Sequence, residues 1–502
     1  MATVTASKRW SSLQEVIFTE FIEGSRHVVV RARAGTGKTT SIVEAVRRLL
    51  TAHPERSVTV CAFNKNIAEE LVTRFVGHNV NVKTLHAIGL SCVKRFWSNV
   101  KVSFGPERAD DLAQRVCGPT APDDIKKLVA KLCTKAREIA PHATSGDELT
   151  NIAIQFECDP DESWAAQGYG LDYVCAKAAL TLELAANEKP MRTGIDGSDM
   201  IFLPVRNHWL HKMCDDVVVD EAQDMTKAQL EIAQGICRGR IVVVGDDKQA
   251  IYGFRGADSG SLDRLKNELN AVEHPLNITY RCAQAIVREA QRFVPDFAAG
   301  DENPEGSVES LDFEKLTQSA GPGDFVLSRV NAPLVSVAMS LLRAGKRTRI
   351  AGRDIGAGLI SLVKKFKATS VPNLIDKITK WEAREIERLS KRYNGKTDHP
   401  TFISRSDAIH DQAEMLTSLT DNAPNVREVE TRIQALFTDD GLGAAGMITC
   451  SSVHKSKGLE AERVFVLTDT LRSTNDEERN ICYVAVTRAK STLVYVTKSE
   501  VR

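Results

Sequence analysis

The sequence predicts an α/β protein built on parallel β-sheets. The first observation is a run of valines, Val28–Val30, followed by a loop of small residues and a helical pattern from Ile42 to Leu50. The second is that two later apolar runs, Val217–Val219 and Ile241–Val244, each lead into acidic residues. β-Branched side chains suit buried strands, and ligands gather where the strands of open α/β sheets end. A ligand-binding site is therefore expected at these strand ends.

The loop after the first strand has the composition of a phosphate-binding loop. Small residues let backbone N–H groups approach phosphate oxygens, and the following helix N-terminus adds partial positive charge. Lys38 would reach the β- and γ-phosphates of a nucleoside triphosphate, and the Thr39 hydroxyl would bind Mg²⁺. Ala32 replaces the usual first glycine, so an ordinary glycine-containing turn is the alternative. The residues expected to hold the nucleotide are Ala34, Gly35, Thr36, Gly37, Lys38, Thr39 and Thr40.

Upstream of this loop, Leu13–Phe18 has the pattern of a short amphipathic helix that contains Gln14. A glutamine amide both donates and accepts hydrogen bonds, so Gln14 could read the edge of an adenine base. The alternative is an ordinary surface glutamine.

Composition narrows the class of protein. The chain has 502 residues, of which 66 are basic and 66 acidic, so its formal net charge is zero. The length predicts about three or four compact units, and neutrality excludes a global basic field but not a local basic track. No apolar run is long enough to span a membrane and no signal-peptide core is present, so no membrane partner is expected. Eleven scattered cysteines without a Cys-x-x-Cys pair indicate reduced thiols of a cytoplasmic protein.

The next segments extend the predicted sheet. Ser57–Phe63 is predicted as a strand, Ile67–Phe75 as a helix, and Val80–His86 as a third strand. From about Lys101 to Glu188 the pattern becomes mainly helical, which predicts an inserted helical domain.

The acidic strand ends carry candidate catalytic groups. Asp220 is placed to hold the Mg²⁺ shell, and Glu221 to orient or deprotonate the attacking water. The other strand end continues as Gly245-Asp246-Asp247-Lys248-Gln249. Exposed acidic turns are the alternative, and the adjoining phosphate loop argues against them.

A series of motifs runs through the whole chain in one order. The segments are Gln14, Ala32–Thr39, Cys61–Leu71, Val82–His86, Val217–Asp224, Val244–Ala257, Leu276–Arg281, Ile448–Glu460 and Glu477–Lys490. In this order they resemble the motifs of superfamily 1 helicases of the UvrD/Rep type. The resemblance implies two RecA-like parallel-sheet motor domains, each with a mainly helical insertion, that bind ATP and Mg²⁺ between them.

The resemblance also implies roles for single residues in ATP hydrolysis. Gln249 would sense the γ-phosphate and couple hydrolysis to DNA. Arg281 and Arg488 would clamp the γ-phosphate, and arginine groups of this kind contribute roughly 10³–10⁵ in rate. The remaining ATP contacts that it implies are Gln14 and Tyr280 at the adenine and Glu460 near the ribose.

DNA contacts are implied on aromatic and polar residues of the same motifs. Aromatic faces stack on successive bases without sequence preference, while hydroxyl, amide and basic groups hold phosphates. Phe254 stands where many relatives carry Trp, which predicts a weaker grip on bases. A buried strand-end position is the alternative for Phe63, and a capping or core role for His86. The implied contacts are Phe63, Asn64, Thr84, His86, Tyr252, Phe254, Arg255 and His454.

The segment before the last motifs carries two blocks of opposite charge. Residues 364–396 contain ten basic and four acidic residues, and residues 398–440 contain three basic and nine acidic residues. The basic block has helical spacing and could lie against duplex phosphates. The equally weighted alternative is a solvated helix paired with the acidic block. The resemblance makes this region a short version of an insertion that regulates unwinding in larger relatives.

These features together predict the domains and the activity. Residues 1–100 and 191–280 are expected to form the first motor domain, with the helical insertion 101–190; residues 281–360 and 446–502 form the second, with the short helical insertion 361–445. The expected activity is that of an ATP-dependent DNA helicase or translocase on single-stranded DNA and single-strand/double-strand junctions. The resemblance implies 3′→5′ movement.

The alternative is a DNA- and nucleotide-sensing ATPase subunit that regulates a separate nuclease or repair partner without processive unwinding. No nuclease domain follows Lys490, so any nuclease is expected to be a separate polypeptide.

Overall fold

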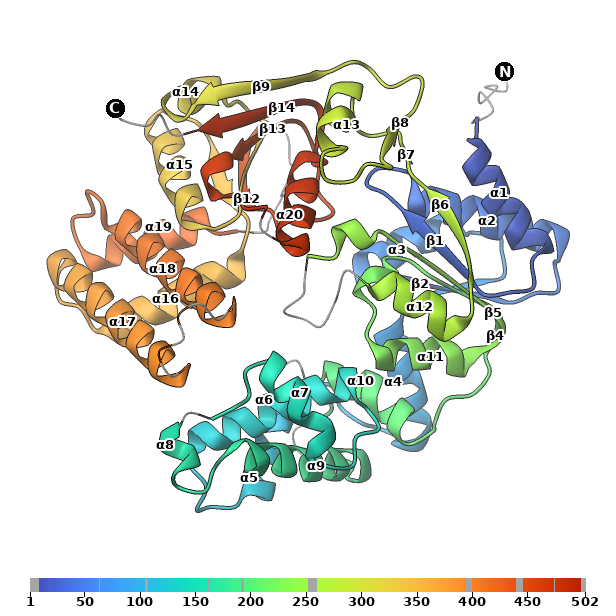
Figure 1. Cartoon of the computed structure of the whole chain (residues 1–502), viewed down its shortest axis with the longest axis horizontal. Helices are drawn as coiled ribbons and strands as arrows, with labels where there is room; N and C mark the ends of the chain where they lie inside the picture. The colour runs from blue at the N-terminus through green and yellow to red at the C-terminus, as the bar shows by residue number, and fades with distance from the viewer. Residues whose placement is uncertain are drawn as a thin grey trace. The chain divides into compact units, whose positions relative to one another are not determined.

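The computed structural model describes residues 9–62, 64–103, 107–160, 162–190, 194–251, 260–393, 395, 397, 400–438, 446–473 and 475–497. The chain forms two compact units, one ending at Leu276 and one beginning at Asn277, and residues Ala34–Thr36 are grouped with the second. Figure 1 shows that each unit contains a sheet flanked by helices and a further group of helices.

The first unit is built on a six-stranded parallel sheet. Its strands are β1 (Val28–Ala32), β2 (Val58–Ala62), β3 (Val80–Thr84), β4 (Cys214–Val219), β5 (Cys237–Gly245) and β6 (Val272–Leu276). They lie in the order β3-β2-β4-β5-β1-β6, and all neighbouring pairs are parallel. The carboxyl ends of β1, β2, β4 and β5 therefore meet at one edge of the sheet, where ligands of α/β proteins bind.

Helices cover both faces of this sheet. They are α1 (Ser12–Glu23), α2 (Lys38–Ala52), α3 (Lys65–Arg74), α4 (Leu85–Phe96), α10 (Gly197–Arg206), α11 (Lys227–Ile236) and α12 (Ser261–Leu269). Val28 and Val30 of β1 belong to one hydrophobic core with α1 and α2, whereas Val29 belongs to another with α11. Because successive side chains of a strand face opposite sides, an uninterrupted valine run is what a strand buried on both faces requires.

The helical insertion of the first unit has a hydrophobic core of its own. Its helices are α5 (Glu107–Cys117), α6 (Asp123–Ile139), α7 (Thr150–Gln155), α8 (Glu162–Ala165) and α9 (Leu171–Asn187), which gather in one group in Figure 1. The core includes Leu132 and Leu182 and reaches Leu203 of α10. The chain enters and leaves the insertion at one place, because Val102 and Ile195 form a parallel bridge.

A buried ion cluster ties this insertion to α10. Arg108 and Arg137 are 2% and 0% exposed. Arg108 Nε lies 2.8 Å from Asp199 Oδ2, and Arg137 Nη1 lies 2.9 Å from Asp196 Oδ2. Asp196 also caps α10 by accepting a hydrogen bond from the Asp199 N–H. Removal of one partner from a buried pair costs about 3–5 kcal/mol, so the cluster fixes the point at which the chain returns to the sheet.

The second unit is built on another six-stranded parallel sheet. Its strands are β9 (Ser307–Asp312), β10 (Phe325–Ser328), β11 (Thr348–Ile350), β12 (Ile448–Ser452), β13 (Ala461–Leu467) and β14 (Ala489–Thr497), in the order β11-β12-β10-β13-β14-β9. All neighbouring pairs are parallel. The accompanying elements are α13 (Gln284–Ala290), α14 (Phe313–Ser319), α15 (Ala332–Arg343), α20 (Asp476–Val486) and the short pair β7 (Ile278–Thr279) and β8 (Ala298–Ala299). The predicted α/β class with two RecA-like parallel sheets is confirmed.

Between β11 and β12 of the second unit, the described residues include the helices α16 (Arg353–Phe366), α17 (Val371–Arg392), α18 (Pro400–Thr420) and α19 (Val426–Leu436). They share one hydrophobic core with the sheet. Leu374, Leu416 and Ile433 of these helices belong to the same cluster as Val326 of β10 and Cys450 of β12. In the described part of the chain, the core of this insertion is therefore continuous with that of the second sheet.

The basic helix α17 forms ion pairs within its own length. Lys380 pairs with Asp376 at 2.8 Å and Lys391 with Glu387 at 2.7 Å, and the two lysine side chains are 69% and 73% exposed. In the acidic block, Asp411 instead accepts hydrogen bonds from the backbone at the start of α15. Helix α17 also packs against α18 of the acidic block, where His410 Nδ1 lies 2.5 Å from Glu382 Oε1. These contacts fit the alternative of a solvated helix beside the acidic block, and contact with duplex DNA stays a prediction.

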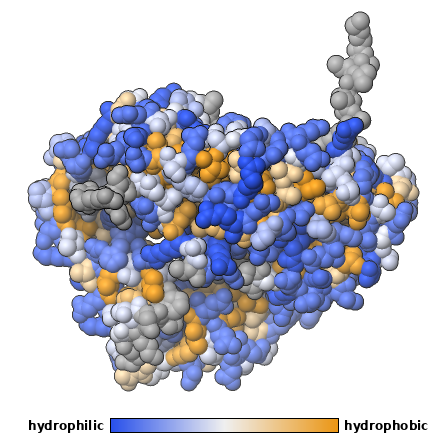
Figure 2. Space-filling model, turned by 45° about the horizontal axis from the view of Figure 1, so that its top comes forward, coloured by the Kyte–Doolittle hydropathy of each residue, from blue (hydrophilic) through white to orange (hydrophobic). Residues whose placement is uncertain are grey.

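The composition makes predictions for the helices, the surface and the cysteines of the structure. Among the described residues, no helix is long and apolar enough to cross a membrane. The face shown in Figure 2 is mostly hydrophilic, with hydrophobic residues scattered across it. All eleven cysteines are buried free thiols, as predicted, and burial raises the pKa of Cys450 to about 12.

Candidate functional site

The predicted phosphate loop joins the end of β1 to the start of α2. Gly35 and Gly37 have φ angles of +68° and +77°, in the left-handed region that glycine adopts without strain. Gly37 is the N-cap of α2, and it offers no side chain to the first N–H groups of the helix. Such N–H groups can bind phosphate oxygens. Of the other predicted loop residues, Ala34 and Thr36 are buried, and Lys38, Thr39 and Thr40 form the first turn of α2.

Two contacts join this first turn to the end of β4. Lys38 Nζ lies 2.9 Å from Glu221 Oε1. The Thr39 hydroxyl donates a hydrogen bond to Asp220 Oδ2, also at 2.9 Å. The parallel sheet thus brings together four predicted site residues from two distant parts of the chain.

The backbone of Glu221 is held in an unusual conformation. Its φ of +54° lies in the left-handed region, which costs a non-glycine residue about 1–2 kcal/mol. Its N–H donates a hydrogen bond to Asp220 Oδ1 at 2.9 Å. Strain of this kind persists only where neighbouring contacts hold it, and it is concentrated at functional sites.

Burial and charge set the protonation of this cluster. The pKa of Asp220 is raised to about 6, because burial and the Glu221 charge outweigh the lowering by Lys38 and the Thr39 hydrogen bond. For Lys38, burial lowers the pKa, but the charges of Glu221, Asp220 and Asp246 outweigh burial and leave the pKa above its usual value. Lys38 is therefore a cation at neutral pH.

The donor set fits a magnesium ion. Mg²⁺ prefers oxygen ligands and is usually bound by one or two carboxylates together with phosphates and water. The Thr39 hydroxyl and the Asp220 carboxylate are oxygen donors already in contact with each other. These two residues would hold the ion.

A second polar cluster lies at the end of β5. The sequence predicts a role for Gln249 alone among its residues. Asp246 is fully buried, and its Oδ2 accepts a hydrogen bond from Gln249 Nε2 at 2.6 Å. Arg33, in the loop after β1, lies 2.7 Å from Asp247 Oδ1 and 3.5 Å from Asp246 Oδ1. Burial raises the pKa of Asp246 against the lowering by Lys38 and Arg33. The sequence feature that points to this cluster is the pair of acidic residues, Asp246 and Asp247, directly after a buried strand.

Gln14 lies on α1 with its amide already hydrogen-bonded. The Ser11 N–H donates to Gln14 Oε1 at 3.0 Å as part of a capping box, and Gln14 Nε2 donates to the Ser41 hydroxyl of α2 at 2.9 Å. The residue is only 3% exposed. Recognition of adenine by Gln14 would require exchange of these bonds and stays a prediction.

Two predicted DNA-contact residues are the N-caps of helices at the same sheet edge. Asn64 caps α3 and Thr84 caps α4, each by accepting a hydrogen bond from the N–H three residues later, at 2.9 and 3.1 Å. The predicted strand Val80–His86 is two residues too long, because the Thr84 cap starts α4 at Leu85. The remaining N–H groups of both helix ends suit phosphate oxygens.

His86 lines a small cavity beside the carboxylates. The cavity has a volume of about 30 Å³, enough for one water, and its lining includes Asp220, Glu221 and Asp224. Burial lowers the pKa of His86, with partial opposition from the charge of Glu138. A neutral imidazole can still form hydrogen bonds, so contact with DNA stays a prediction beside the core role.

The other predicted DNA contacts are less defined. Phe63, Tyr252, Phe254 and Arg255 lie outside the residues that the structure describes. His454 lies in the turn after β12 and is partly exposed. Stacking and phosphate binding by these residues stay predictions.

In the second unit, Glu460 lies between two cations. Arg281 Nε is 2.5 Å from Glu460 Oε2, and Lys490 Nζ is 3.0 Å from Glu460 Oε1. Burial raises the pKa of Glu460, but the charge of Arg281 and the contact with Lys490 outweigh burial and hold the pKa below its usual value. Tyr280, the predicted adenine-stacking residue, is 50% exposed.

Arg488 is a buried guanidinium near the same cluster. It is 1% exposed and donates hydrogen bonds to the carbonyl oxygens of Val484 and Leu459, at 3.0 and 3.1 Å. Burial and the charge of Arg281 lower the pKa of Arg488 to about 10. An anion beside it would therefore be favourable, as a phosphate clamp requires.

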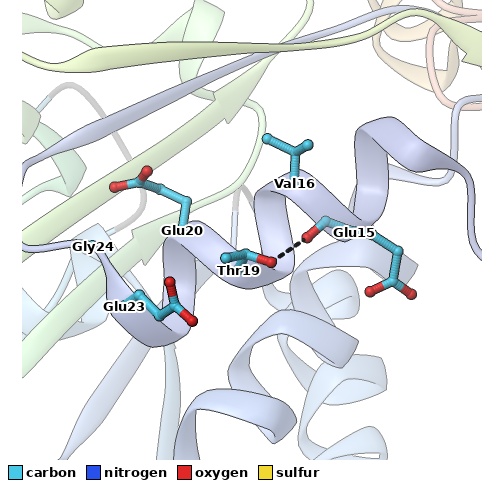
Figure 3. A pocket seen from close by; sticks show the side chains of 6 residues that line it. All are labelled: Glu15, Val16, Thr19, Glu20, Glu23 and Gly24. Carbon is cyan, nitrogen blue, oxygen red and sulfur yellow. Dashed lines mark hydrogen bonds between the residues drawn. The ribbon is translucent and has the colours of Figure 1, made fainter.

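A wider cavity lies on the outer face of α1. It has a volume of about 480 Å³ and is lined by Glu15, Val16, Thr19, Glu20, Glu23 and Gly24. Figure 3 shows the carboxylates of Glu15, Glu20 and Glu23 projecting from this helix. An acidic lining repels phosphates, so the candidate site is assigned to the strand ends.

Two stretches of the chain match domains of one helicase family. Residues 16–270 match the UvrD/REP helicase N-terminal domain, and residues 447–496 match the UvrD-like helicase C-terminal domain. The first match alone covers 255 of the 502 residues, and it includes both strand ends of the first candidate cluster.

The chain is also similar, at low identity, to proteins named as DNA helicases. The chain is 24% identical over 545 residues to F-box DNA helicase 1 of Gallus gallus, which covers 96% of this chain and 48% of that protein. It is 27% identical over 297 residues to ATP-dependent DNA helicase Rep of Escherichia coli, with coverage of 54% and 41%. It is 25% identical over 547 residues to ATP-dependent DNA helicase UvrD2 of Mycobacterium tuberculosis, with coverage of 92% and 75%. The chain thus spans half or less of the length of the first two relatives.

Proposed function

Because the chain belongs to the UvrD/REP helicase family, we propose that it is an ATP-dependent DNA helicase that moves 3′→5′ along single-stranded DNA. Relatives named ATP-dependent DNA helicases support the activity. The direction of movement rests on the resemblance of the motifs alone. The free buried thiols suit a reducing compartment, and we place the protein in the cytoplasm.

The observation that carries the proposal is the pair of contacts between the start of α2 and the end of β4. Lys38 meets Glu221, and Thr39 meets Asp220, at the carboxyl edge of a parallel sheet. This is the set of groups that phosphoryl transfer from ATP needs: a cation for phosphate, oxygen ligands for Mg²⁺ and a base for water.

In the proposed reaction, Lys38 exchanges Glu221 for the β- and γ-phosphates of ATP. The exchange releases Glu221 Oε1, which then orients or deprotonates the attacking water. Thr39 and Asp220 would hold Mg²⁺, which neutralises phosphate charge when bound.

Groups outside this cluster complete the proposed reaction. Gln249 would sense the γ-phosphate, and Arg281 and Arg488 would stabilise the charge that develops on it. Tyr280 and Gln14 would contact adenine, with Glu460 near the ribose.

DNA binding is proposed at the helix ends beside the ATP site. The N-termini of α3 and α4, at Asn64 and Thr84, offer backbone N–H groups to DNA phosphates. His86 and the residues outside the described parts of the chain, Phe63, Tyr252, Phe254 and Arg255, would add stacking and polar contacts, as would His454. Because α3, α4 and Glu221 share one sheet edge, bound DNA can influence the proposed base.

One observation favours the alternative of a sensing ATPase subunit without processive unwinding. The insertion α16–α19 shares its hydrophobic core with the second sheet. A large apolar interface opposes domain rotation, and the resemblance assigns regulation of unwinding to this region. Such a subunit would act on a separate nuclease or repair partner.

One experiment separates these functions. ATP hydrolysis is measured with and without single-stranded DNA, and the same sample is given a duplex with a 3′ overhang. DNA-stimulated hydrolysis with strand displacement supports the helicase, and a 5′-overhang duplex that is not displaced supports the direction. Stimulated hydrolysis without displacement from either duplex supports the sensing subunit. An ATP hydrolysis rate that is the same with and without DNA would contradict both the helicase and the sensing subunit.

A further inference from the structure

Gln223 lies in the short turn that follows Glu221 and is fully buried. Both ends of its amide are used. Its Nε2 donates a hydrogen bond to Glu221 Oε2 at 2.6 Å, and its Oε1 accepts one from the Asp246 N–H at 3.0 Å. One side chain therefore links the end of β4 to the end of β5.

The link uses both functions of an amide. Glutamine carries a donor and an acceptor on one planar group at every pH, and the three-bond reach of its side chain spans this gap. The opposite strand end is shaped for it, because a Cβ at Gly245 would lie 2.6 Å from Gln223 Oε1. Any side chain at position 245 would push the amide out of place.

The link continues beyond Asp246. The Asp246 carboxylate accepts a hydrogen bond from Gln249 Nε2 at 2.6 Å. Glu221, Gln223, Asp246 and Gln249 thus form one hydrogen-bonded series, in which Asp246 contributes its N–H on one side and its carboxylate on the other. A shift of the turn that holds Gln249 moves Asp246, and through Gln223 it moves Glu221.

The two oxygens of Glu221 have different partners. Oε1 contacts Lys38, and Oε2 contacts Gln223. Under the proposed function, ATP draws Lys38 away from Oε1. The hydrogen bond from Gln223 then holds the carboxylate in place during the reaction.

We propose that Gln223 is a positioning residue that fixes the Glu221 carboxylate for hydrolysis and transmits the state of Gln249 to it. The inference rests on the proposed function and deepens it, since it identifies the connection by which DNA stimulates hydrolysis. Gln223 itself touches neither ATP nor DNA in this scheme.

The test compares Gln223→Leu and Gln223→Glu with the wild type in ATPase assays with and without single-stranded DNA. Loss of a residue that orients a reacting group commonly costs 10–100-fold. We expect Gln223→Leu to lower the DNA-stimulated kcat by about that factor, with KM for ATP within about threefold and with stimulation by DNA nearly lost. Gln291→Leu is the control for loss of one glutamine hydrogen bond, because Gln291 Nε2 donates to the Phe297 carbonyl oxygen in the second unit and has no proposed role.

Gln223→Glu gives a readout that a purely structural role would not move. A protonated glutamic acid at position 223 can donate to Glu221 and accept from the Asp246 N–H. When this group loses its proton, two carboxylates lie side by side and repel each other, so the pair favours keeping one shared proton. The activity of this variant relative to the wild type should therefore be highest at low pH and decline as pH rises. Thermal unfolding of each variant, compared with its kcat, separates loss of fold from loss of position.

The outcomes distinguish the two levels of the hypothesis. A wild type that hydrolyses ATP with DNA stimulation, beside folded Gln223 variants with normal kcat and stimulation, would overturn this inference alone. A pH-independent activity ratio for Gln223→Glu would do the same. A folded wild type without ATPase activity would overturn the proposed function together with the inference.

Discussion

Lys38 Nζ lies 2.9 Å from Glu221 Oε1, so the cation of the phosphate loop and the proposed base neutralise each other at the carboxyl edge of the first sheet. A phosphate that attracts the ammonium releases the carboxylate in the same step. Nucleotide binding and the readiness of the base are linked through one ion pair, which leads directly to the first prediction.

Replacement of Lys38 by alanine should abolish ATP turnover and spare most DNA binding. The variant loses the charge that holds the phosphates, and a single electrostatic contact of this kind is worth about 10²–10³ in kcat. Steady-state ATPase assays and single-stranded DNA binding by fluorescence anisotropy measure the two effects. Lys127→Ala is the control, because its side chain is 73% exposed in the helical insertion. Normal turnover by Lys38→Ala would remove the loop from the active site.

The pKa of Asp220, raised to about 6, predicts an acid limit on magnesium binding. Below pH 6 the carboxyl group is mostly protonated and loses its affinity for metal, so the Mg²⁺ concentration needed for half-maximal ATPase activity should rise as pH falls through 6. Metal titrations between about pH 5 and about pH 8 test this. Asp220→Asn, which is neutral throughout, should show weak activity without this dependence.

The same group has an effect of defined sign on stability. A folded-state pKa above the unfolded value contributes stability at low pH that is lost as pH rises through the folded pKa. Without Mg²⁺, the difference in Tm between the wild type and Asp220→Asn should therefore decrease as pH rises from about 4 to about 7. A constant difference in Tm would contradict the raised pKa.

Gln14→Ala should weaken the preference for ATP over GTP and also destabilise α1. The amide is both the predicted adenine contact and part of the capping box with Ser11. Ser11→Ala removes the cap without the amide and should cost a similar amount, about 1 kcal/mol, in unfolding free energy. Competition between ATP and GTP in the ATPase assay separates the loss of adenine recognition from the loss of the helix cap. Equal nucleotide preference in both variants would return Gln14 to a purely structural role.

Asn64→Ala should weaken the binding of single-stranded DNA. The change removes a polar side chain and loosens the N-terminus of α3, where phosphate oxygens are proposed to bind. Asn425→Ala is matched to it, because Asn425 caps α19 with the same 2.9 Å hydrogen bond. Both variants should lose about 1 kcal/mol of stability, and only Asn64→Ala should lose DNA affinity, as measured by salt-dependent binding titrations. Equal DNA affinity would exclude the α3 terminus from the DNA site.

Arg281→Ala should lower kcat by roughly 10³ with a smaller change in KM for ATP. Its guanidinium is proposed to stabilise charge that develops only in the transition state. Lys490→Ala removes the other cation beside Glu460, at 3.0 Å, and controls for disturbance of that carboxylate. Steady-state ATPase kinetics on both variants measure the difference. Equal losses in kcat would mean that both cations act only by holding Glu460.

Much of the fold follows from local patterns in the sequence. Runs such as Val28–Val30 and Val217–Val219 are buried on both faces, and only strands inside a covered parallel sheet accept such continuity. The meeting of Lys38 with Glu221 could be expected for the same reason, since parallel strands deliver their carboxyl ends to one edge.

The rest depends on which polar groups meet in three dimensions. Nothing local distinguishes the Thr84 hydroxyl as a helix cap from a strand residue, and the strand was therefore predicted to extend to His86. The Arg33–Asp247 pair and the Gln223 link join residues from separate strands. Gln14 carried a role by resemblance, whereas its hydrogen bonds to Ser11 and Ser41 depend on how α1 lies against α2.

The bridge between Val102 and Ile195 has a consequence for how this protein can change. Nearby, Gly194 has a φ of +78°, and a Cβ there would lie 2.9 Å from the Lys101 carbonyl oxygen, so the two chain segments that lead into and out of the insertion touch. A segment whose ends adjoin can be exchanged, lengthened or deleted at a loop-closure cost that grows only slowly with its length. A short turn could therefore replace the first helical insertion. The sheet that remains should still fold if the residues that the deletion uncovers are also changed: Leu203 in the shared core, and Asp196 and Asp199, which lose their arginine partners.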